Sequence, residues 1–217
     1  NGNAGRTFGL IKSGGATQIL GSNFVGHFTG FTIVSGGVLQ VDGNLARSPV
    51  VSVVNGGRLQ GTGLIGGEIV VSGANSTLAP GASPGTLTVS GNVTMASGTI
   101  FEAEILGSLS GEYDVLAMMP AATLTLGGAT LSVIAPSALP YLSVYPVITG
   151  WGSIASSTFD GLPDGATFTA GANQFLINYG TKAGYADSVT LTVVPEPGSL
   201  AIPSLIGLML FLRRHRR

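Results

Sequence analysis

The chain has 217 residues, of which 9% are charged and 7% aromatic, with 35 glycines and no cysteine, so disulfides and thiol chemistry are excluded. The residues before Pro195 contain five Lys and Arg against nine Asp and Glu, a net charge of −4. This balance argues against a nucleic-acid partner, which would need a basic patch, and against binding of the body to anionic lipid.

The first residues of the sequence show no signal-peptide pattern. The sequence begins at Asn1 without a basic and apolar export segment. We therefore expect either a processed chain or the C-terminal part of a longer protein, and repetition close to the first residues favours the second.

A short pattern recurs from residue 32 onward. Residues 32–41 read TIVSGGVLQV, and residues 52–61 read SVVNGGRLQG, 20 positions later. Degenerate copies begin at Ile69 and Leu87, which places the equivalent leucine-like positions at 39, 59, 78 and 100. A period near 20 with short strands and glycine turns predicts a solenoid.

Each repeat is interpreted as strand, turn, strand. The segments are rich in β-branched residues, and the Gly-containing pairs between them favour turns. Stacking of successive units at about 4.8 Å buries one face of each strand. We predict a solenoid over residues 1–135, with these side chains inward: Val34, Leu39, Val54, Leu59, Val71 and Leu78.

The second half is less regular. Residues 124–133 fit one more unit, whereas residues 135–146 contain three prolines and interrupt the pattern. A solenoid end leaves unpaired strand edges and an exposed core, so it needs a cover. We predict an irregular antiparallel β cap over residues 136–194.

Two stretches carry a family resemblance. Residues 61–67 (GTGLIGG) and 78–89 (LAPGASPGTLTV) resemble the strand repeats of autotransporter passenger regions. The resemblance implies an all-β, right-handed parallel β-helix. The C-terminal segment differs from the membrane barrel of that family, so self-transport is not implied.

Two patterns imitate catalytic motifs. Gly61, Gly63 and Gly66 match the dinucleotide fingerprint in letters, but a strand pattern follows where a helix is required. Ser83 matches a nucleophile elbow, but Pro84 lacks the N–H that would bind the oxyanion. Neither pattern predicts an enzyme.

Glu102 and Glu104 need separate consideration, because two carboxyls on one strand face resemble a glycosidase pair. No Arg or Lys lies between residues 59 and 181, and Asp114 is expected in a turn. Without a nearby cation, we interpret the pair as a solvated strand face. No metal-ligand run is present in the sequence, so no metal or cofactor is predicted.

The last residues form a three-part tail. Pro195, Glu196 and Pro197 precede 13 uncharged residues, 200–212, which are followed by arginines at Arg213, Arg214, Arg216 and Arg217. A helix of that length spans about 20 Å, less than the hydrocarbon core of about 30 Å. We expect a short transmembrane helix, with membrane contact through residues 198–212 and the arginines on the cytoplasmic side.

The tail, residues 195–217, resembles the PEP-CTERM sorting signal of exported proteins in Gram-negative bacteria. The resemblance implies an exosortase-like membrane protease as a partner, which cleaves near Pro195–Pro197. It also implies transient residence in the inner membrane, then the cell surface, outer envelope or extracellular matrix.

The sequence as a whole predicts a structural or adhesin-like surface protein, without enzyme activity, in a setting where extracellular polysaccharide is a possible partner. Two alternatives stay open. One is a carbohydrate-active β-helix enzyme whose catalytic part is missing from this chain. The other is a surface protein anchored permanently by its uncleaved tail.

Overall fold

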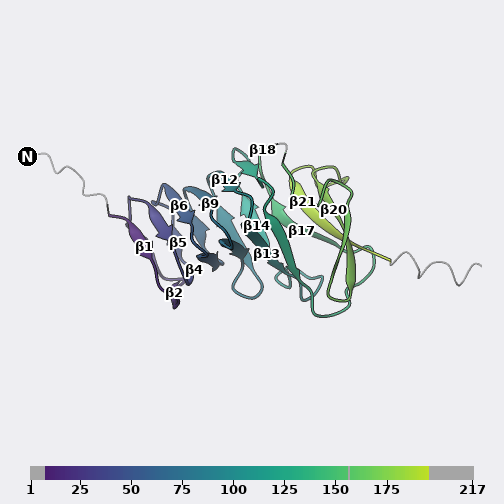
Figure 1. The fold of residues 1–217 in the computed structure, drawn as a ribbon, viewed down its shortest axis with the longest axis horizontal. Helices are drawn as coiled ribbons and strands as arrows, with labels where there is room; N and C mark the ends of the chain where they lie inside the picture. Colours follow the sequence, from purple (N-terminus) through teal and green to yellow (C-terminus); the bar gives the residue numbers. More distant parts are fainter. Residues whose placement is uncertain (1–7, 156, 196–217) are drawn as a thin grey trace, which may run out of the picture.

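The computed structural model describes residues 8–155 and 157–195, and none of these residues is helical. They form an elongated all-β body made of three sheets that run side by side along its length (Figure 1). In the regular part of each sheet, neighbouring strands come from successive coils of the chain, so each coil lies on the one before it.

The strands divide among three sheets, here called A, B and C. Sheet A contains β1 (Leu10–Lys12), β3 (Thr32–Val34), β6 (Val50–Val53), β9 (Glu68–Val71), β12 (Val93–Met95), β15 (Thr123–Thr125) and β18 (Ser153–Ile154). Sheet B contains β2 (Thr17–Leu20), β4 (Val38–Val41), β7 (Arg58–Gly61), β10 (Thr77–Pro80), β13 (Ile100–Glu104) and β16 (Thr130–Ile134). Sheet C contains β5 (Asn44–Leu45), β8 (Leu64–Ile65), β11 (Thr86–Val89), β14 (Val115–Met118), β17 (Val144–Thr149), β21 (Ser188–Val194), β20 (Asn173–Tyr179) and β19 (Thr167–Ala170).

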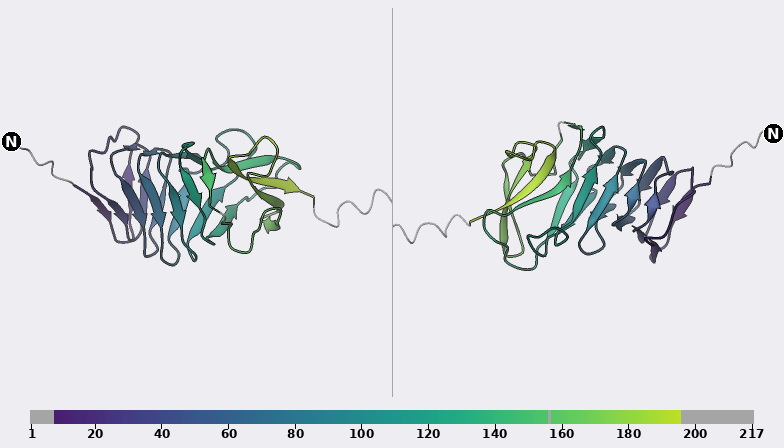
Figure 2. Two further views of the ribbon diagram at one scale, coloured as in Figure 1. Left: turned by 90° about the horizontal axis from the view of Figure 1, so that it is seen from above. Right: turned by 180° about the vertical axis from the view of Figure 1, so that it is seen from behind.

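Each regular coil has three strands, one in each sheet, and the strands of successive coils lie side by side (Figure 2). The ladders between coils are parallel, which agrees with the predicted β-helix architecture. The two-strand interpretation of each unit is wrong, because it missed the sheet C strands. β5 and β8 are two residues long, too short to show an alternating pattern.

The core consists of columns of stacked apolar side chains. Leu39 pairs with Leu59 and Leu59 pairs with Leu78, and all three are fully buried. Val34 and Val71 are also buried, as predicted. Stacking like residues at the strand spacing removes each one from water without any need for charge or disulfides.

Two predicted positions are wrong by one residue: the inward position at Val54 and the leucine-like repeat position at 100. Val53, not Val54, pairs with Val34 and is fully buried, because the turn after β6 holds one residue more than the turn after β3. Phe101, not Ile100, continues the leucine column by pairing with Leu78. In both cases the side chains alternate between faces, so a shift of one residue exchanges inside for outside.

The fourth copy of the repeat is not equivalent to the other three, whose first strands (β3, β6 and β9) lie in sheet A. The segment that begins at Leu87 belongs to β11 in sheet C, whereas β12 stands below β9 in sheet A. Residues 124–133 do form one more coil, through β15 and β16, as predicted. Parallel pairing then continues through β17 and β18.

The C-terminal end of the body is closed by antiparallel strands. β21 pairs antiparallel with β17 and with β20, and β19 pairs antiparallel with β20. The ring centroid of Phe159 lies 5.7 Å from that of Phe101, so Phe159 packs against the apolar column inside the body. This arrangement agrees with the antiparallel cap expected in the second half.

The N-terminal end has a buried lysine and several exposed apolar side chains. Lys12 pairs with Val34 and so occupies a core position, where its Nζ donates hydrogen bonds of 2.8 to 2.9 Å to three backbone carbonyls. Several apolar side chains of this end are exposed: Phe8, Ile11, Ile19, Val25 and Phe31.

The tail begins where the last described strand ends. β21 stops at Val194, and Pro195 follows it in an irregular conformation. The other predicted tail residues, including the expected short helix of residues 200–212, lie outside the described residues. Within residues 8–155 and 157–195, no helix is long and apolar enough to cross a membrane.

Candidate functional site: a polar pocket on sheet B

The outer face of sheet B carries a chain of hydrogen-bonded polar side chains. Gln60 donates to Gln40 at 3.0 Å, and Gln40 donates to Asp42 at 2.6 Å. On its other side, Gln60 accepts from Arg58 Nε at 2.8 Å. These residues come from β4 and β7 and the turn after β4, and the strand alternation that buries Leu39 and Leu59 turns them outward.

Arg58 also forms an ion pair with Glu102, with 2.5 Å between its guanidinium nitrogen and Glu102 Oε1. The expectation that no cation lies near the glutamate pair is therefore wrong. Arg58 is 44 residues away in the chain, but only β10 lies between β7 and β13 in the sheet. Glu102 and Glu104 do share one face of β13, as predicted.

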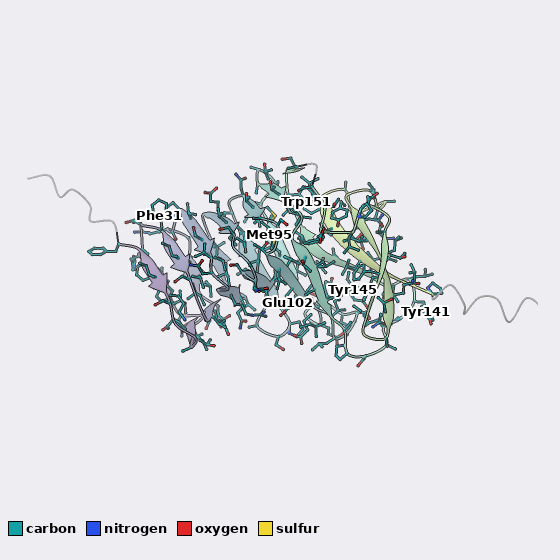
Figure 3. The ribbon with its side chains drawn as sticks, in the orientation of Figure 1. Phe31, Met95, Glu102, Tyr141, Tyr145 and Trp151 are labelled. Carbon is teal, nitrogen blue, oxygen red and sulfur yellow. The ribbon has the colours of Figure 1, made fainter. Side chains whose placement is uncertain are left out.

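Beside this ion pair lies a pocket of about 210 Å³. Figure 3 shows Glu102 on the middle part of the body, away from both ends. The floor is formed by the small residues of β10, which leave room between the longer side chains of the neighbouring strands. The polar and charged residues that line the pocket are Arg58, Gln60, Ser83, Glu102, Glu104 and Asp114.

The pocket exists because the coils lengthen at this point. Along sheet A, successive paired positions are Thr32, Val51, Ile69, Val93 and Leu124, so the spacing grows from 19 and 18 to 24 and 31 residues. The added residues include the turn at 81–85 and the loop at 105–114. These two insertions bring Ser83 and Asp114 to the rim of sheet B.

The side chain of Asp114 connects the turn at 81–85 to the end of β13 by hydrogen bonds. Its Oδ1 accepts the N–H of Gly85 at 2.9 Å, and its Oδ2 accepts the N–H of Glu104 at 2.8 Å. A Cβ at Gly81 would collide with this carboxylate, which explains the glycine there. The side chain is almost fully buried, and this burial raises the pKa of Asp114 to about 6.

This geometry limits the chemistry that the pocket can perform. The Glu102 carboxylate is paired with Arg58, and both oxygens of Asp114 are used by backbone N–H groups. Ser83 has a positive φ of 82° in an exposed turn, and no histidine lines the pocket. In the part of the chain that the structure describes, no group of three His, Asp or Glu side chains is placed to hold a metal ion.

What the pocket offers is a set of fixed donors and acceptors. Arg58 and Gln60 present N–H groups, and the carboxylates of Glu102 and Glu104 present acceptors. Donors and acceptors held in place by one another lose little freedom when a ligand binds. Such a surface suits a ligand with many hydroxyl groups.

The sequence matches no protein-family model and no curated protein.

Pro195, the one sequence-predicted site residue among the described residues, does not line this pocket. Pro195 follows β21 at the C-terminal end of the body, and Glu196, Pro197 and the four arginines lie outside the described residues. Sequence reasoning missed Arg58 and Asp114 as parts of the pocket. The repeated glutamines at 40 and 60 were a usable signal, because the 20-residue period places them side by side.

Proposed function

We propose that the chain is an exported structural protein of the cell surface or extracellular matrix, adhesin-like, and sorted by an exosortase-type system. The three-part order of the tail carries this proposal: Pro195–Pro197, an apolar run, then arginines. The tail enters the membrane with its arginines on the cytoplasmic side, and the protease then releases the β body outward.

The fold of the body supports this role. The paired part of β21 ends at Val194, so the folded cap and the Pro-Glu-Pro segment adjoin without overlapping. Proline lacks the N–H that a ladder requires, so the two prolines of the Pro-Glu-Pro segment disfavour an extension of the β21 ladder into it. An unpaired segment next to the membrane is accessible to a membrane protease.

Mass spectrometry of the mature protein from its native host tests the proposal. We expect the C-terminal peptide of the surface-exposed protein to end near Pro195–Pro197. If the peptide that ends in Arg217 remains on most of the surface-exposed protein, processing does not occur. The tail would then be a permanent anchor, which is the alternative reading of the same segment.

The matrix partner in this proposal is an extracellular polysaccharide, bound in the pocket on sheet B. The carrying observation is the hydrogen-bonded row that runs from Asp42 to Glu102 beside that pocket. We also propose a right-handed winding, because crossovers between parallel strands are right-handed in about 98% of cases.

A second candidate, a carbohydrate-active enzyme, is favoured by one observation: Glu102, Glu104 and Asp114 line a common pocket with Arg58. We expect the double substitution Glu102→Gln and Glu104→Gln to leave any turnover of purified polysaccharides, measured at saturating concentration, unchanged. Binding of the same polysaccharides should weaken, because two acceptors are altered. A large loss of turnover in this variant would promote the enzyme reading over the structural one.

A further inference from the structure

We propose that the turn formed by Tyr141 and Leu142 is a membrane-contact element that rests in the lipid interface next to the tail. The inference depends on the proposed insertion of the tail and adds a second point of contact, on the folded body. Its ligand is the apolar–polar boundary of a bilayer.

The turn is exposed and apolar at its tip. Leu142 is 74% exposed and Tyr141 is 66% exposed. Figure 3 shows Tyr141 at the end of the body beside β21, opposite the end that carries Phe31. Beneath the turn lies a hollow of about 180 Å³, and no charged residue lines it. Tyrosine and leucine side chains suit the interface, where the apolar part is buried and the hydroxyl stays hydrated.

The backbone of this turn is unfavourable for leucine. Leu142 has a φ of +66°, and Ser143 N–H donates to Pro140 C=O at 3.3 Å. A positive φ at the third residue of such a turn favours glycine or asparagine, and a branched apolar side chain is rare there. The leucine gains no packing in return, since its side chain points into solvent. A strained residue that contributes no buried contact suggests a function outside the folded body.

The turn is held rigidly against the last strand. Leu142 N–H donates to Val193 C=O at 2.9 Å, and Val193 N–H donates to Ser143 C=O at 3.0 Å. Asn173 fixes the preceding loop, because its side chain accepts from Leu139 N–H at 2.7 Å and donates to Ser137 C=O at 2.8 Å. The tip is therefore held in a fixed place beside Val193, which lies two residues before the start of the tail at Pro195.

The length of the connection brings this tip to the membrane. Residues 195–199 separate β21 from the apolar run. Five residues span at most about 18 Å when fully extended, so an inserted tail keeps the cap close to the bilayer. The hollow is too small to hold the 13-residue apolar run itself, which favours lipid over the tail as the occupant.

Site-specific labelling of the full chain in phosphatidylcholine vesicles tests the inference. The chain has no cysteine, so each single-cysteine variant carries one label. An environment-sensitive dye is attached at Leu142→Cys, and separately at Tyr141→Cys in case the first variant folds poorly. Leu109→Cys is the matched control, since Leu109 is 68% exposed in the loop between β13 and β14. Leu208→Cys reports insertion of the tail.

We expect nitroxide-labelled lipids to quench the dyes at 141 and 142 about twofold more than the dye at 109, because interfacial contact places them within about 5–10 Å of the acyl boundary. The quenching should not depend on salt, since no charged residue lines the hollow. Quenching at 208 without quenching at 141 and 142 would overturn this inference and leave tail insertion standing. No quenching at 208 would overturn both, including the case in which the tail folds back onto the body.

Discussion

The Arg58 guanidinium reaches across β10 to the Glu102 carboxylate, so one ion pair joins two strands that are not neighbours in sheet B. Both side chains are partly exposed, so water weakens the attraction. A double-mutant cycle with Arg58→Gln and Glu102→Gln should give a coupling of about 0.5–1 kcal/mol in urea unfolding. The coupling should shrink in 1 M salt, as screening requires.

The matched control for this cycle is Glu104→Gln, which lies on the same face of β13 but has no ion pair with Arg58 in the structure. We expect its coupling with Arg58→Gln to be close to zero. Equal coupling at both glutamates would mean that the effect is general charge and not the Arg58–Glu102 contact.

The one-residue shift in the core column predicts a contrast between two adjacent valines. Val53 is fully buried beneath Val34, whereas Val54 is half-buried in the turn. Removing two buried methyl groups and leaving a cavity should make Val53→Ala cost about 2 kcal/mol of unfolding free energy. Val54→Ala should cost less than about 1 kcal/mol. Urea unfolding followed by circular dichroism measures both, and the reverse order would refute the register.

Burial of Asp114 predicts a pH dependence of stability. Because the pKa of Asp114 rises to about 6 on folding, the folded protein binds more protons than the unfolded chain between about pH 4 and pH 6. The contribution of this group to the unfolding free energy is therefore greatest at low pH and falls by up to about 3 kcal/mol as pH rises through 6. Above that window its contribution should be constant.

Asp114→Asn isolates this contribution, because the amide does not titrate. The stability advantage of the unsubstituted protein over the variant should shrink as the pH rises from 4 to 7. Asp160→Asn, at an exposed position, is the control and should leave the pH dependence of the unfolding free energy unchanged. If the unfolding free energy of Asp114→Asn depends on pH as it does in the unsubstituted protein, Asp114 is not the titrating group.

The backbone of Leu142 predicts a stabilising substitution. Leu142→Gly removes the penalty of a positive φ and loses little packing, so it should raise the unfolding free energy by about 1 kcal/mol. Leu109→Gly, at a similarly exposed leucine without a positive φ, should instead lower it by about 0.5 kcal/mol. Thermal unfolding of the two variants side by side measures the difference. A loss of stability at Leu142→Gly would show that the turn is not strained.

Much of the solenoid is visible in the sequence because it repeats locally. The echo between residues 32–41 and 52–61 places Leu39 above Leu59, and the structure pairs them. Alternation of polar and apolar residues predicts which face of each strand is buried. The same reasoning placed Glu102 and Glu104 on one outer face of β13.

The candidate pocket was less predictable, because its parts are far apart in the chain. Arg58 and Glu102 come together because β7 and β13 lie on either side of β10 in sheet B. Asp114 joins the same pocket from a loop that interrupts the repeat. The spacing of the repeat gives no information about how a loop of irregular length folds back. Two-residue strands such as β5 leave no periodic signal at all.

The sequence alone therefore determined the all-β class, the stacking of like residues and the three-part order of the tail, since each depends on residues near one another in the chain. The tertiary structure decided the third sheet, the choice of Val53 over Val54 in the core, and the meeting of Arg58 with Glu102. These depend on how many residues each turn holds, and one extra residue in a turn is enough to exchange the two faces of a strand.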